Sequence, residues 1–118
     1  MSDTLTKVAT IKKLEIIIRP GKLDAVKKAL AAAGYTGVTI SQAEGQGNQK
    51  GATHAGYRMD MMSKLRLEIV VPEADVEKMI DAVSQAARTG EPGDGKIFIS
   101  DVQDVVRIRT GERGAKAL

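Results

Sequence analysis

Two glycine-rich segments carry the residues best suited to bind phosphate. Residues 44–51 read EGQGNQKG, and residues 89–96 read TGEPGDGK. Glycine lets backbone N–H groups approach phosphate oxygens, and Lys96 can neutralise their charge. Two such segments in one chain indicate a phosphate site, with two plain surface turns as the alternative.

The second segment matches a Walker A motif only in part. Gly90, Gly95 and Lys96 satisfy the G-x-x-x-x-G-K pattern, but Ile97 stands at the Ser/Thr position. A strand is also predicted after Lys96, where the motif requires a helix. These departures exclude a P-loop nucleotide hydrolase.

Arg107 and Arg109 form a second candidate for anion binding. Residues 104–109 are rich in β-branched side chains and are predicted to form a strand. Side chains two positions apart in a strand lie on one face, so both guanidinium groups could clamp a polyphosphate. A solvent-exposed strand edge is the alternative.

No side-chain set typical of catalysis accompanies these cations. His54 is the only histidine, and it has no neighbouring carboxylate in a glycine-containing loop. The sequence shows neither a Ser/His/Asp set, nor an HExxH motif, nor paired carboxylates. Catalysis is therefore disfavoured.

The composition indicates one small domain that gains from assembly. The chain has 118 residues, 42% of them hydrophobic, and its only aromatic residues are Tyr35, Tyr57 and Phe98. A domain of this size with an aliphatic core would gain from burial against other subunits.

Charge and hydropathy exclude several classes of protein. The chain has no cysteine, which removes disulfides and thiolate zinc sites. No apolar run approaches a membrane span of about 20 residues, and the first ten residues do not resemble a signal peptide. The net charge of +3 is dispersed, and so few rings disfavour specific nucleic-acid binding. We expect a cytoplasmic protein.

The spacing of apolar residues predicts the elements that position these sites. Alternation predicts strands, and a spacing of three and four predicts helices. Residues 44–58 are predicted to form a long loop, the usual place for function. Strands are predicted at residues 14–19, 37–40, 65–71, 96–100 and 104–109, and helices at residues 22–33 and 76–87.

The order strand, helix, strand occurs twice in the chain. Arg19 and Pro20 precede the first helix as Val71 and Pro72 precede the second. This duplication predicts an α+β, ferredoxin-like fold built as a split βαβ, a four-stranded antiparallel sheet with two helices on one face. The other face of the sheet is expected to be apolar and buried in a trimer or dimer.

Several segments, in the right order, resemble the PII (nitrogen-regulatory) signal-transduction proteins. Residues 89–99, TGEPGDGKIFI, are similar to the C-terminal signature of that family, and residues 106–114, VRIRTGERG, to its tail. In the N-terminal half, residues 17–23 and the glycine pattern of residues 45–51 are similar as well. The resemblance covers a PII-like domain at residues 11–118, after an N-terminal extension at residues 1–10.

This resemblance implies a homotrimer with ATP or ADP in three clefts between subunits. Thr39 and Glu68 would lie near the adenine, and the two arginines on phosphate. One side of each cleft would be formed by Ile17, Gly45, Gly47, Gln49, Val70, Gly93, Asp94, Gly95 and Lys96. The neighbouring subunit would supply Gly37, Thr39, Glu68, Arg107 and Arg109.

The resemblance also implies 2-oxoglutarate beside MgATP. Gln49 matches the ligand of Mg²⁺, Lys64 matches the lysine that pairs with the acid, and Lys50 and Gly51 complete this candidate site. The long loop, called the T-loop in this family and placed here at residues 47–62, would respond in shape to the bound effectors.

Three features depart from the family pattern. Asn48, a further position of the nucleotide site, stands where the family usually has an arginine that reaches the terminal phosphate. The segment between Gly51 and Lys64 is shorter than usual. Tyr57 lies seven positions before Lys64, as the modifiable tyrosine of the family does, and is a candidate modification site. We expect a divergent member with a shortened T-loop.

We therefore predict a non-enzymatic signal-transduction regulator that senses ATP or ADP, with 2-oxoglutarate as a further effector. Through its T-loop it would control a membrane transporter or a metabolic enzyme of nitrogen metabolism, without binding nucleic acid or inserting into the membrane. A slow ATPase that uses the same cleft and a structural trimer without ligand control are the alternatives.

Overall fold

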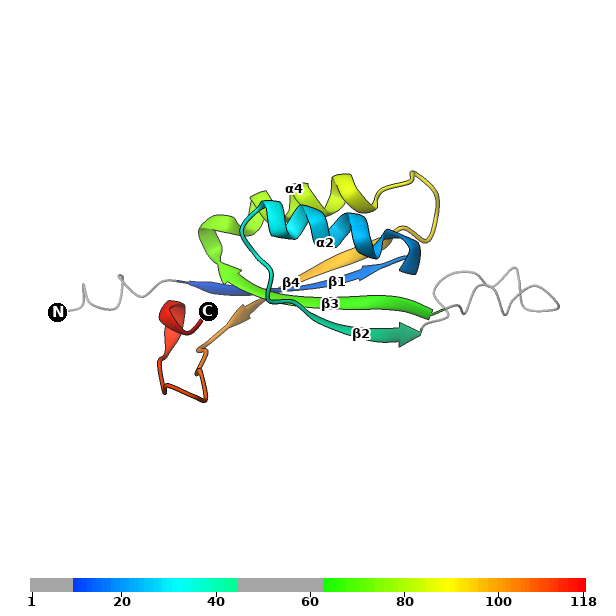
Figure 1. Ribbon diagram of the computed structural model, residues 1–118. Helices are drawn as coiled ribbons and strands as arrows, with labels where there is room; N and C mark the ends of the chain where they lie inside the picture. The colour runs from blue at the N-terminus through cyan, green and yellow to red at the C-terminus, as the bar shows by residue number, and fades with distance from the viewer. Residues whose placement is uncertain (1–9, 45–62) are drawn as a thin grey trace.

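A four-stranded antiparallel sheet with both helices on one face forms the body of the chain (Figure 1). The structure is a computed structural model and describes residues 10–44 and 63–118. The order of the strands is β2-β3-β1-β4, which confirms the predicted ferredoxin-like α+β fold. The elements are β1 (Ile11–Ile18), the 3₁₀ helix η1 (Pro20–Lys22), α2 (Leu23–Ala32), β2 (Thr39–Glu44), β3 (Ser63–Pro72), η3 (Glu73–Asp75), α4 (Val76–Ala87), β4 (Gly95–Val102) and η4 (Gly114–Ala117).

The core lies between the helices and the sheet and is aliphatic, as predicted. Alternate residues of β1 and β3 point toward the helices, and the helices bury residues at a spacing of three and four. The fully buried side chains include Leu14, Ile16, Val26, Leu30, Leu67, Val71, Met79 and Val83.

Proline and glycine set the ends of the helical segments. Pro20 begins η1 and Pro72 precedes η3, and both η segments lead directly into a longer helix. Proline suits the start of a helix, because the first N–H groups there have no carbonyl partner within the helix and proline has no N–H. Gly34, with φ +99°, follows the end of α2 and supplies the left-handed backbone that many helix ends require.

The predicted strand at residues 104–109 is not formed. β4 ends at Val102, and beyond it only an isolated bridge joins Val106 to Arg113. The carboxylate of Asp104 accepts bonds from the backbone N–H groups of Val105, at 2.7 Å, and Gly114, at 3.1 Å, and from the guanidinium of Arg113. Such local bonds compete with strand pairing, so the β-branched composition misled the prediction.

The face of the sheet opposite the helices is charged, so the prediction of an apolar face is wrong for its centre. The Lys13 ammonium lies 3.4 Å from the Glu68 carboxylate, and Arg66 Nε lies 2.9 Å from Glu15 Oε2. Arg66 also donates a long hydrogen bond, 3.4 Å, to the Ser41 hydroxyl. The residues that alternate with the core positions of β1 and β3 are thus mainly ionic, and they neutralise one another across strands.

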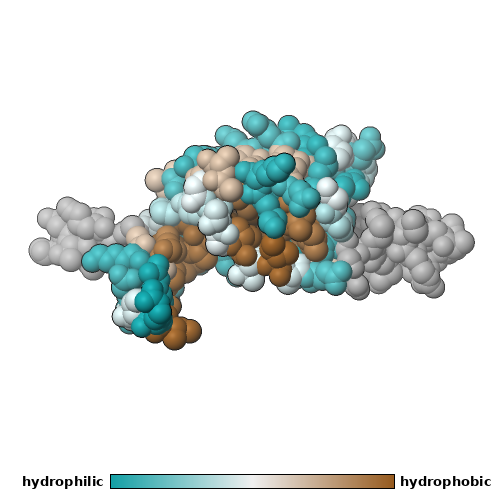
Figure 2. Space-filling model, in the orientation of Figure 1, coloured by the Kyte–Doolittle hydropathy of each residue, from teal (hydrophilic) through white to brown (hydrophobic). Residues whose placement is uncertain are grey.

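Apolar surface is instead concentrated on edge strands and on the C-terminal segment (Figure 2). Phe98 and Ile99 of β4 are about half exposed, and Ile108 is 96% exposed. Exposed apolar groups of this kind gain from burial against a partner. Assembly with other subunits therefore stays an expectation for this chain.

We predict that Gly95 is indispensable to the fold. Its φ is +116°, and a Cβ built on it would lie 1.7 Å from the Ile17 carbonyl oxygen. Gly95→Ala should therefore lower the free energy of unfolding by at least about 2 kcal/mol, measured by urea unfolding at one fixed protein concentration. Gly21→Ala is the matched control, because a Cβ there meets no atom within 4 Å. Equal midpoints for both variants would contradict the prediction.

Candidate functional site

The glycine-rich loop at residues 89–95 is shaped by the carboxylate of Asp94. This carboxylate accepts bonds from the Thr89 hydroxyl, from the Thr89 N–H at 2.7 Å and from the Gly90 N–H at 2.8 Å. The hydrogen bond from the Thr89 hydroxyl, followed by those from the backbone and from Arg19, holds the pKa of Asp94 well below its usual range. Asp94 is therefore ionised at neutral pH and gives the loop a fixed shape.

Two cationic side chains outside the loop hold its outer part. Arg19 Nη2 donates to the Pro92 carbonyl at 2.7 Å, and its Nε donates to Asp94 at 3.2 Å. The Lys64 ammonium donates to the Gly93 carbonyl at 3.1 Å. Gly93 has φ +98°, and a Cβ there would come within 3.3 Å of the Arg19 guanidinium. The loop thus presents its remaining backbone groups in one arrangement, as an anion site requires.

Lys96 lies directly after this loop, at the start of β4. It pairs with Ile17 of β1, so these two predicted site residues are adjacent in the sheet. A cavity of about 250 Å³ opens here, with a mainly apolar lining. It is lined by Ile16, Ile17, Ile18, Val83, Ser84, Ala87, Arg88, Asp94, Gly95, Lys96 and Ile97.

Thr39, Glu68 and Val70 lie across the sheet from Lys96. Thr39 begins the edge strand β2 opposite Glu68, and β4 is the other edge of the sheet. Two strands separate these edges, which corresponds to roughly 14 Å at the usual spacing. Val70 pairs with Lys13 of β1. It lies five positions along β3 from Leu65, which pairs with Ile18, and Ile18 pairs in turn with Gly95 at the start of β4. Val70 therefore lies two positions beyond Glu68 along β3, away from the end of the strand that faces the glycine-rich loop.

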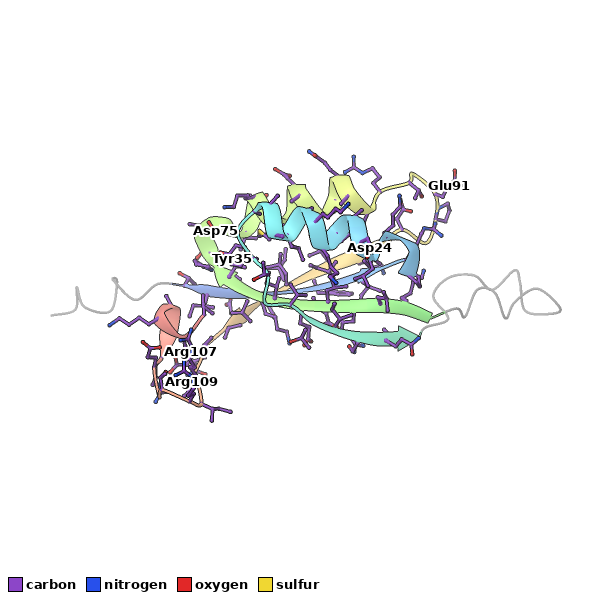
Figure 3. All side chains as sticks on the ribbon, viewed as in Figure 1. Asp24, Tyr35, Asp75, Glu91, Arg107 and Arg109 are labelled. Carbon is purple, nitrogen blue, oxygen red and sulfur yellow. The ribbon has the colours of Figure 1, made fainter. Side chains whose placement is uncertain are left out.

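Arg107 and Arg109 lie in the C-terminal segment, beyond the opposite end of β4 (Figure 3). They are not on a strand, contrary to the sequence-based expectation. The Arg107 guanidinium lies 3.2 Å from the Glu112 carboxylate and donates to the Leu118 carbonyl at 3.0 Å. The backbone of Arg107 also bonds to Glu112 and Gly111. A tight turn thus carries both arginines, in place of the extended clamp.

Several predicted residues lie outside the described part of the chain. They are Gly45, Gly47, Asn48, Gln49, Lys50, Gly51, His54 and Tyr57. Within residues 10–44 and 63–118, no three His, Cys, Asp or Glu side chains are placed to hold a metal ion. No helix in these same ranges is long and apolar enough to cross a membrane.

Sequence reasoning missed Arg19 and Thr89 as residues of this site. Arg19 precedes Pro20, at the end of β1, 75 positions before Asp94. No local pattern connects residues so far apart, whereas the threonine five positions before Asp94 could have been recognised as a hydroxyl that closes the turn.

Comparison with known proteins gives one consistent family. A family model described as Nitrogen regulatory protein P-II matches residues 11–112. Proteins named Nitrogen regulatory protein P-II from Azospirillum brasilense and Synechocystis sp. are 49% and 53% identical over 112 residues, which cover 92% of this chain and 100% of each relative. The crystal structure of Arabidopsis thaliana PII bound to citrate has a TM-score of 0.79 and 43% identity, covering 93% of this chain and 94% of that one.

We predict that Asp94 makes the stability of the loop and fold pH dependent. Because its folded-state pKa is lowered, its stabilisation is present above the ordinary Asp pKa of about 4 and is lost as the pH falls through the folded-state value. Asp94→Asn should therefore lower the urea midpoint at neutral pH, and its difference from wild type should shrink as the pH drops below about 4.

Asp81→Asn, at an exposed position of α4, is the matched control and should differ little from wild type at any pH. If the urea midpoint of Asp94→Asn stays below that of wild type by the same amount from neutral pH to about pH 3, the carboxylate charge does not stabilise the loop.

Proposed function

Because this chain belongs to the P-II family of nitrogen regulatory signal-transduction proteins, we propose that it binds ATP or ADP in clefts between the subunits of a homotrimer. The regulatory role is that of the family. The ligands, the trimer and the residue assignments are proposed from the resemblance to that family and from the arrangement of the described side chains.

The observation that carries the proposal is the placement of the candidate residues on opposite sides of one chain. The glycine-rich loop and Lys96 lie at one end of β4, and the arginines, labelled in Figure 3, lie beyond the other end. Lys96 and Val102 lie six residues apart in β4, which is roughly 20 Å along the strand. The arginines follow Val102 in the chain. One phosphate chain cannot reach both groups within a subunit, and this separation supports a site that a second copy completes.

Each side of the proposed cleft supplies a different chemistry. The loop offers backbone N–H groups and the Lys96 ammonium to phosphate, together with the apolar surface of Ile17. Val70 would belong to this same side of the cleft. The neighbour would bring Thr39 and Glu68 to the adenine, with Gly37 beside them, and the two arginines to phosphate. Phosphate would replace the Glu112 carboxylate as the acceptor for Arg107, a charge-assisted contact that planar guanidinium groups favour.

Lys64 would connect the cleft to the T-loop, which we place at residues 47–62. Lys64 lies near the start of β3, immediately after that segment, and its ammonium holds the Gly93 carbonyl of the glycine-rich loop. A dicarboxylate such as 2-oxoglutarate would compete for the same ammonium, with Mg²⁺ held through Gln49, and Lys50 and Gly51 nearby. Binding of the dicarboxylate would thus alter the start of β3, where the T-loop ends. This loop would contact the partner protein, which is either a membrane transporter or a metabolic enzyme.

The slow ATPase considered as an alternative has no support. The relatives are named regulatory proteins, and this family is one of signal transduction. We therefore propose ligand sensing without a catalytic residue.

Calorimetric titration tests the proposal directly. ADP and MgATP should each bind with measurable heat, and 2-oxoglutarate should be titrated with and without MgATP. If neither nucleotide binds, the proposed function is wrong. A steady release of phosphate from ATP by the purified trimer would instead revive the ATPase.

We predict that Arg107→Ala weakens ADP binding tenfold or more, because hydrogen bonds to charged groups contribute about 1.5–3 kcal/mol. The trimer should persist in sedimentation velocity. Lys116→Ala removes the same charge from an exposed position of the same segment and should leave the affinity close to that of wild type. Equal affinities for wild type and Arg107→Ala would remove Arg107 from the cleft.

A further inference from the structure

Tyr35 anchors the segment that leads from α2 to Gly37 and Thr39. Residues 35–38 have no regular secondary structure. The Tyr35 N–H donates to the Leu30 carbonyl at 2.9 Å, and the half-buried ring packs against the hydrophobic core. Its hydroxyl donates to the carboxylate of Asp75, at the end of η3. Figure 3 shows Tyr35 and Asp75 beside one another, between the end of α2 and the start of α4.

The bond between Tyr35 and Asp75 joins the two halves of the duplicated fold. Asp75 lies 40 positions after Tyr35, and the Lys78 ammonium lies 4.0 Å from the same carboxylate. Burial of the ring, and then the hydrogen bond to Asp75, raises the pKa of Tyr35 to about 12. The hydroxyl therefore keeps its proton at neutral pH and remains a donor.

Gly37 depends on the anchors on either side of it. It is exposed, and a Cβ built on it would meet no atom within 4 Å, so little packs against Gly37 itself. Val38 packs against the core on one side, and Tyr35 is tied to Leu30 and Asp75 on the other. The position of Gly37 is thus fixed by these two neighbours, while Thr39 is also held by its pairing with Glu68 in the sheet.

We infer that Tyr35 is a positioning residue for the base-binding side of the nucleotide cleft, through its hydrogen bond to Asp75. The inference rests on the proposed function, which puts Gly37 and Thr39 beside the base. Removal of the hydroxyl leaves the ring in the core and releases the segment from η3. Contacts to the base weaken, while Lys96 and the arginines keep their contacts with phosphate.

Tyr35→Phe in the full-length protein tests this inference, with ADP and GDP as paired probes in calorimetry. The affinity for ADP should fall at least threefold while that for GDP stays within twofold, so the preference for adenine decreases. Asp75→Ala should reproduce this loss, and the double variant should be no weaker than either single one. Asp75→Asn keeps an oxygen acceptor for the Tyr35 hydroxyl and should retain most of the preference.

The outcomes separate this inference from the function on which it rests. If wild type binds no ADP, the proposed function fails and the inference falls with it. If wild type binds ADP and Tyr35→Phe has the same preference for ADP over GDP, only the inference is overturned. An equal loss for both nucleotides would also overturn it, because that pattern reports a general loss of structure.

Discussion

Strand β4 separates the glycine-rich loop from the C-terminal arginines by its whole length. Gly95 begins the strand opposite Ile18, and Val102 ends it opposite Ile11. The close approach of Gly95 to the Ile17 carbonyl fixes where the strand begins, since no residue with a Cβ fits there. Antiparallel pairing with β1 then carries the chain away from the loop at about 3.3 Å per residue. If the proposed cleft is correct, ligand binding in this protein is tied to assembly, because one chain would hold only half of each cleft.

The charged face of the sheet bears on how the subunits would meet. Lys13 with Glu68 and Arg66 with Glu15 form pairs across β1 and β3. If this face is covered in the proposed trimer, these pairs within each chain would add little to the stability of the assembly. Desolvation costs charged groups about as much as their attraction returns. The hydrophobic contribution to subunit association would come from exposed residues of the edge strands and the C-terminal segment, such as Phe98 and Ile108.

The fold was predictable where local signals agreed, and the site was predictable only in part. Alternating residues, helical spacing and Pro20 and Pro72 all indicated the same duplicated unit, and the structure has it. Composition alone could not tell a strand from the turn that carries Arg107, because Asp104 ties that segment to its own backbone. Contacts between distant residues, such as Arg19 with Asp94 or Tyr35 with Asp75, leave no local pattern in a single sequence. The remaining residues of the proposed cleft come from the resemblance to the family pattern.

Subunit complementation tests most directly whether the cleft is shared between copies. Lys96→Ala and Arg107→Ala proteins, each deficient in ADP binding, are unfolded together and refolded as a mixture, with each variant refolded alone as the control. If one subunit supplies Lys96 and its neighbour supplies Arg107, random mixing regenerates about one intact cleft in four, with wild-type affinity. Calorimetry should then detect a tight class of sites that neither parent has. A mixture that binds ADP no better than the average of its parents would contradict the shared cleft.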